Sequence, residues 1–156
     1  MSRLPERSPL ERGFRIAYPI GLVICLAWPL ALQAMLGSAI HPTPFPAAEA
    51  VQQLGYTFTG LTCAGALFVT WRWSRIRTGF SKRPADRQRR TVVREILLYS
   101  ALFECSSLFG LLYYALGGPQ AERYSRGFIA LTPIMFFVFV PRLQAWRAAA
   151  GPEPGD

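Results

Sequence analysis

The chain has 156 residues, of which 51% are hydrophobic, with eleven Phe, four Trp and a mean hydropathy of +0.22. It is more apolar than a soluble domain of this length requires, and its charges are poorly mixed along the sequence. The formal net charge of +8 does not need a nucleic-acid partner to explain it, because the basic residues cluster as they do in cytoplasmic membrane loops.

Four apolar windows with almost no charged residues follow one another along the chain. They cover about residues 15–37, 53–72, 95–117 and 126–145. Each is about 20 residues long, which is the length of helix that crosses a hydrocarbon core of about 30 Å. None has the polar stripe that a soluble four-helix bundle would turn to water. We predict an all-α membrane protein with one four-helix transmembrane domain at residues 15–146 and disordered cytoplasmic tails at 1–14 and 147–156.

The first window has a second interpretation. Arg3, Arg7, Arg12 and Arg15 precede an apolar run that ends in "LGSA", which resembles the cleavage site of a signal peptide. The run is longer than the usual apolar core of about 7 to 15 residues and contains Pro29. We therefore favour a membrane span over a cleaved segment.

The Lys and Arg residues are divided unevenly between the two ends of the predicted helices. Four precede the first helix, nine lie between Arg72 and Arg94, and two follow Val140, whereas the two opposite loops hold none and two. Because positively charged loops stay in the cytoplasm, both termini and the central loop are predicted to be cytoplasmic. We expect a multi-pass protein of the inner (plasma) membrane that contacts the lipid bilayer and, through its basic loop, anionic lipid headgroups.

Aromatic residues agree with this orientation. Trp71, Trp73 and Trp146 fall at the predicted cytoplasmic ends, and Tyr113 and Tyr124 fall near the outer ends. We interpret them as the two aromatic belts of a membrane protein.

An internal repeat is a further feature of the four windows. A shift of eighty residues aligns the first window with the third and pairs Cys25 with Cys105, and a shift of seventy pairs Phe58 with Phe128. The identities are few, so a degenerate tandem repeat of two helix pairs and chance similarity both stay open. Glu104 has no counterpart in such a repeat.

Glu104 is the one acidic residue far from a predicted helix end. It lies in "LFECSSLFGLL", about eight residues or 12 Å beyond Ile96, and therefore near the midplane of the membrane. Inserting an acidic side chain at this depth costs about 2.5 to 3.5 kcal/mol. Such residues usually face protein or a water-filled cavity, and they mark the paths of ions or protons.

The residues around Glu104 allow two interpretations. Helical spacing places Ser100 and Ser107 on its face, and the second window offers Thr59 and Thr62 on a stripe of small residues that lets helices approach closely. In the first interpretation Glu104 binds and releases a proton or Na⁺, with these four hydroxyls as candidate ligands. In the second, a neutral Glu104 hydrogen-bonds Thr59 or Thr62 and only holds two helices together.

Residues 54–117 resemble the ion-binding hairpin of the rotary ATPase proteolipids, the c/K subunits. The similarity consists of Glu104 with the following "CSSLFGLL", a small-residue helix that runs inward, a basic cytoplasmic loop and a returning helix that carries the carboxylate. The resemblance implies that Glu104 is the ion carrier, that Ser100, Ser107 and Thr62 support it, and that Gly110 is a packing position.

These observations predict a proton- or cation-handling membrane subunit that associates with itself or with other membrane subunits. The alternative is a non-catalytic structural or assembly subunit of a membrane complex. We expect no enzymatic activity, because no set of catalytic side chains is apparent. We also expect no metal or cofactor, because Cys25, Cys63 and Cys105 lie in helices without a CxxC pattern and His41 is the only histidine.

Overall fold

The computed structural model describes residues 8–36 and 48–151, and every regular element in these ranges is a helix. The elements are α1 (Pro9–Leu36), α2 (Ala48–Arg77), α3 (Ala85–Gly117), the short 3₁₀ helix η1 (Gly118–Ala121), α4 (Glu122–Phe139) and α5 (Leu143–Ala150). The predicted all-α class is confirmed for this part of the chain. Residues 1–7, 37–47 and 152–156 lie outside the described residues, and with them His41 and the outermost parts of the predicted tails.

The first three helices extend beyond the apolar windows that predicted them. Helix α1 begins at Pro9, inside the predicted disordered tail 1–14, and the hydroxyl of Ser8 accepts the backbone N–H of Glu11 at 3.4 Å as an N-terminal cap. Helix α3 begins at Ala85, ten residues before the apolar window. Arg, Glu and Gln are good helix formers, so the charged flanks continue the helix after the apolar character has ended.

The fourth window corresponds to two helices, which corrects the predicted span at 126–145. Helix α4 begins at Glu122 and ends at Phe139, because Pro141 lacks a backbone N–H and holds Val140 in an extended conformation with φ −75° and ψ 120°. The chain then turns into α5. Residues 147–150, which were predicted to belong to a disordered tail, are therefore helical.

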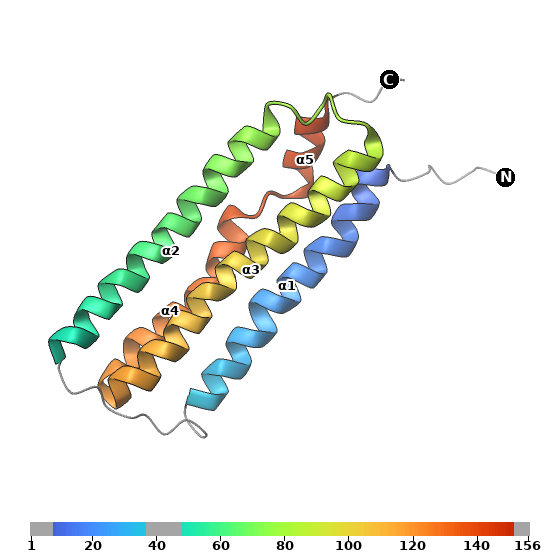
Figure 1. Cartoon of the computed structure of the whole chain (residues 1–156). Coiled ribbons are helices and arrows are strands. Elements are labelled where there is room, and N and C mark those ends of the chain that lie inside the picture. Colours follow the sequence, from blue (N-terminus) through green and yellow to red (C-terminus); the bar gives the residue numbers. More distant parts are fainter. Residues whose placement is uncertain (1–7, 37–47, 152–156) are drawn as a thin grey trace.

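Helix α3 is the centre of the bundle. It packs against α1, α2 and α4, and Figure 1 shows it running between α1 and α2 along most of its length. Tyr99 and Phe103 of α3 and Phe136 of α4 form the middle of the main apolar core, and all three are almost completely buried. The start of α1, the turn between α2 and α3, and α5 lie together at one end of the bundle (Figure 1).

Helix α5 closes this end of the bundle through Trp146. The indole is completely buried, with its ring centre 4.6 Å from that of Trp73 and 5.2 Å from that of Phe80. An ion pair between Arg147 and Glu11 also links α5 to α1. Trp146 is thus a core residue and not the belt residue that its position near the end of the chain predicted.

Two stretches of the described chain are long and apolar enough to cross a membrane. They are Pro9–Leu36, with a mean hydropathy of 1.9, and a window within Ala85–Ala150, with 1.7. Only 28% of the residues in each window are buried inside the chain. The apolar character of these stretches therefore lies mainly on the outside of the bundle.

Gly110 allows α3 and α4 to approach closely, which makes it a sensitive position for stability. A Cβ atom at Gly110 would lie 2.6 Å from the backbone oxygen of Ser125 and 2.7 Å from Cγ1 of Ile129. The Gly110→Ala variant is therefore expected to lower the free energy of unfolding by about 1–3 kcal/mol. Thermal unfolding of the purified protein in detergent measures the effect.

The matched control for this variant is Gly127→Ala on α4, where a new Cβ meets no atom within 4 Å. We expect it to leave stability unchanged or slightly increased, because alanine has the higher helix propensity. Equal stability of the two variants would contradict the close contact between α3 and α4 at Gly110.

Candidate functional site

The side of α3 that faces α2 is defined by aromatic and apolar contacts. The ring centres of Phe58 and Phe109 lie 4.7 Å apart in a stacked arrangement, and the Cβ position of Gly65 lies 3.7 Å from Cγ of Leu102. Each residue turns a helix by about 100°, so Glu104 lies about 200° around the axis from Leu102. Glu104 is therefore on the side of α3 that faces away from α2.

The carboxyl group of Glu104 lies beside α1, and its two oxygens are inaccessible to solvent. It is close enough to the thiol of Cys25 to interact with it electrostatically. Both carboxylate oxygens are buried, and neither has a hydrogen-bond partner among the residues that the structure describes. The residue as a whole is only half-buried, because its methylene groups are more accessible than its carboxylate oxygens. Among the described residues no cation lies beside this carboxyl group, and the hydroxyl of Ser107 is close enough to interact with it.

The hydroxyl groups on this side of α3 form hydrogen bonds with groups other than Glu104. Ser100 donates to the carbonyl oxygen of Ile96 at 2.9 Å. Thr132 can donate to the carbonyl oxygen of Phe103 at 3.0 Å, and its oxygen lies 2.7 Å from that of Ser107 in a hydrogen bond that either hydroxyl can donate. A hydroxyl group has one proton to donate. When Thr132 donates to Phe103, Ser107 donates to Thr132 and can accept a hydrogen bond from a protonated Glu104; when Thr132 donates to Ser107, the proton of Ser107 is available to an ionised Glu104.

The structure does not bring Thr59 and Thr62 to Glu104, which corrects the expected contact with α2. Thr59 donates to the carbonyl oxygen of Gly55 at 2.9 Å, and Thr62 donates to that of Phe58 at 2.8 Å. Thr62 lines a small apolar cavity with Leu102, on the opposite side of α3. Of the four predicted ligands, Ser100 and Ser107 share the side of Glu104 and the two threonines do not.

A second carboxylate, Glu95, binds two arginine side chains at once. It is completely buried, and Arg72 of α2 binds it with two nitrogen atoms, one of them Nη2 at 2.9 Å from Oε1. Nη2 of the neighbouring Arg94 lies 2.8 Å from the same oxygen. This cluster joins α2 to α3 at the end of the bundle that carries α5. The sequence did not predict this cluster, because Arg72 was counted only among the basic residues of the central loop and Glu95 was not singled out.

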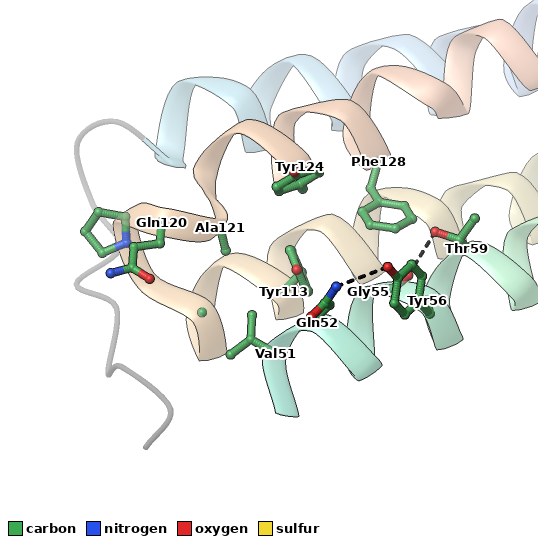
Figure 2. Close-up of a pocket in the computed structure, with 12 residues that line it drawn as sticks. Val51, Gln52, Gly55, Tyr56, Thr59, Tyr113, Gln120, Ala121, Tyr124 and Phe128 are labelled. Atoms are coloured by element: carbon green, nitrogen blue, oxygen red, sulfur yellow. Dashed lines mark hydrogen bonds between the residues drawn. The ribbon is translucent and has the colours of Figure 1, made fainter. Parts of the chain in front are cut away.

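A pocket of about 530 Å³ lies at the opposite end of the bundle, between α2, α3, η1 and α4. Figure 2 shows Tyr113, Tyr124 and Phe128 on one side of it and Gln52 and Tyr56 on the other. Nε2 of Gln52 donates to the hydroxyl of Tyr56 at 3.1 Å. The described residues that line the pocket carry no charge and offer it aromatic faces and neutral polar groups.

The described residues contain no group of three or more His, Cys, Asp or Glu side chains that could hold a metal ion. Comparisons of the chain with protein-family models, with curated proteins and with solved structures give no match. The resemblance of residues 54–117 to the proteolipid hairpin therefore stays a prediction.

Proposed function

We propose that the chain crosses the membrane four times and that it binds and releases protons, or a small cation, at Glu104. The exposed surface of the bundle supports the membrane part of this proposal. Large apolar side chains cover the outer faces of α1, α2 and α4, as in Val23, Leu67 and Val138, which are 61%, 70% and 67% exposed. Lipid is the solvent that suits such a surface, because burying apolar area from water contributes roughly 25 cal/mol per Å².

The distribution of charge supports a cytoplasmic location for both ends of the chain. The start of α1, the end of α2, the start of α3 and α5 share one end of the bundle (Figure 1), and thirteen of the fifteen Lys and Arg residues in the described ranges belong to or adjoin these regions. The remaining two, Arg123 and Arg126, lie at the opposite end. Retention of positive charge in the cytoplasm places the basic end inside the cell.

The observation that carries the proposed activity is the environment of the Glu104 carboxyl group. Its two oxygens are buried and form no hydrogen bond with the described residues, so no bond between helices offsets the cost of burying this polar group. A purely structural role as interhelical glue would require such a bond. A role in ion handling requires instead a group that is neutral at rest and becomes charged when a proton leaves.

A proton suits the site better than a metal cation. A protonated Glu104 needs one acceptor nearby, and the hydroxyl oxygen of Ser107 can accept a hydrogen bond from it while Ser107 and Thr132 remain hydrogen-bonded to each other. A cation needs several oxygen ligands at once, whereas this side of α3 brings together one carboxylate and the hydroxyl oxygens of Ser100 and Ser107, whose lone pairs could contribute to such a site. The first expectation is therefore proton binding and release.

The experiment that tests this function is a flux measurement on the purified protein in liposomes. An enclosed pH-sensitive dye reports proton entry after a potassium diffusion potential is imposed, and the proteoliposomes are expected to acidify faster than protein-free ones. The same measurement with an imposed Na⁺ gradient separates the two ions. Equal rates with and without the protein would contradict the proposal and favour the structural or assembly role.

A further inference from the structure

The first turns of α3 carry an array of arginine residues that the proposed ion path does not use. Arg87, Arg90 and Arg94 recur at helical spacing along one face, and Arg83 joins them from the preceding turn. Two adjoining hollows open on this surface. One, of about 630 Å³, is lined by Arg83, Arg87, Arg90, Thr91 and Arg94, and the other, of about 500 Å³, by Asp86, Arg89, Arg90, Val93 and Arg94.

Two of the guanidinium groups are held in place by the protein itself. Nη1 of Arg83 donates to the hydroxyl of Thr91 at 3.1 Å, which folds this side chain back onto the helix. Nε and Nη2 of Arg94 both donate to Oε1 of the buried Glu95, at 3.1 and 2.8 Å. Fixed side chains lose less conformational entropy when a ligand binds.

Arg87 and Arg90 differ from these two residues, because neither forms an ion pair within the part of the chain that the structure describes. Arg90 also lines both hollows. The surface has one acidic side chain, Asp86, at the edge of the smaller hollow. It therefore keeps a clear excess of positive charge that is free to bind anions.

The position of the array along α3 matches the headgroup layer in the proposed membrane arrangement. The apolar window begins at about residue 95, so Arg94 lies at its edge and Arg90 about 6 Å further out. The headgroup layer on each side of a bilayer is roughly 5 to 7 Å thick. Arg90 and Arg94 would therefore lie at the depth of lipid phosphates, and Arg87 just beyond them.

We propose that this surface is a binding site for an anionic phospholipid with two phosphate groups joined by a short bridge. One phosphate occupies each hollow, and Arg90 and Arg94 lie between the two. Planar guanidinium groups bind phosphate oxygens with paired hydrogen bonds, which gives them a preference over other cations for this ligand. The inference rests on the proposed membrane arrangement but not on ion handling by Glu104.

Native mass spectrometry of the full chain in detergent tests this site. The protein is titrated with cardiolipin, which has two phosphates, with phosphatidylglycerol, which has one, and with inorganic pyrophosphate, which has no lipid chains. We expect cardiolipin to bind most tightly. In the Arg87→Gln, Arg90→Gln double variant its affinity is expected to fall about 30-fold.

The matched control is the Arg75→Gln, Arg77→Gln double variant on α2, which removes the same charge from exposed arginines at the same end of the bundle. It is expected to bind cardiolipin as the unmodified chain does. An equal loss of cardiolipin affinity in the two double variants would overturn the proposed site, because general charge attraction would then explain the binding. If phosphatidylglycerol binds as tightly as cardiolipin, the site does not require two phosphate groups. If pyrophosphate binds more tightly than cardiolipin, the ligand is not a lipid. Proton flux through the same preparations reports on Glu104 separately, so the two proposals fail independently.

Discussion

Replacing Glu104 by Gln is expected to reduce proton flux to that of protein-free liposomes. The amide has nearly the same shape as the carboxyl group and keeps hydrogen-bonding capacity, but it cannot bind or release a proton. The bundle should be unaffected, because neither oxygen of Glu104 forms a hydrogen bond with the described residues. The measurement is dye acidification at equal protein density, with thermal unfolding in detergent as the check on folding.

The matched control is Glu122→Gln, the same chemical change at the outer end of α4, where the carboxylate is partly exposed and paired with Arg126. This variant should keep the full flux. A Ser107→Ala variant should lower the rate without abolishing it, because it removes the hydroxyl that can accept a hydrogen bond from the protonated carboxyl group. If Glu104→Gln folds normally and conducts as well as Glu122→Gln, Glu104 is not the proton carrier.

Replacing Glu95 by Gln is expected to have the largest effect on stability. The change leaves Arg72 and Arg94 without the buried carboxylate that now binds both. Removing one partner of a buried ion pair costs about 3–5 kcal/mol, and the lower value applies here because both arginines are partly in contact with solvent. Thermal and chemical unfolding in detergent should show a loss of about 3 kcal/mol.

Two comparisons make the Glu95 prediction specific. The Glu122→Gln variant breaks an exposed pair four residues apart on one helix and should cost less than about 0.5 kcal/mol. The double variant Glu95→Met, Arg72→Met should be less destabilised than the sum of its two single variants, because neither charge is left without its partner. Additive losses would mean that the contact between Arg72 and Glu95 does not stabilise the bundle.

The helical class could be predicted from the apolar windows, but the ends of the helices could not. Apolar windows identify the segments that are long enough to cross a membrane, whereas the helices continue through Arg- and Glu-rich flanks such as residues 85–94. Pro141 was the available signal for the end of α4, since proline disfavours a helical conformation in the residue before it. The burial of Trp146 in α5 depends on contacts with Trp73 and Phe80, which no local pattern reveals.

The candidate site could be predicted in part. The position of Glu104 along α3, and Ser100 and Ser107 beside it, follow from helical spacing alone. The rotation of α3 about its axis cannot be predicted in this way, because apolar side chains surround the helix and leave no preferred face. The stacking of Phe58 on Phe109 shows which side of α3 faces α2, and Glu104 lies on the side away from Thr59 and Thr62. Glu95 and Arg72 are 23 residues apart, so their contact depends on how two helices pack.

The state of the Glu104 carboxyl group can be measured most directly by its reaction with dicyclohexylcarbodiimide, an apolar reagent that modifies protonated carboxyl groups. Purified protein in detergent is treated over a range of pH and analysed by peptide mass spectrometry. We expect modification at Glu104 and not at Glu95 or Glu122, with a rate that falls as the pH rises and the carboxyl group loses its proton. A Glu104 that resists the reagent at every pH, or that reacts no faster than Glu122, would contradict a buried, proton-binding carboxyl group.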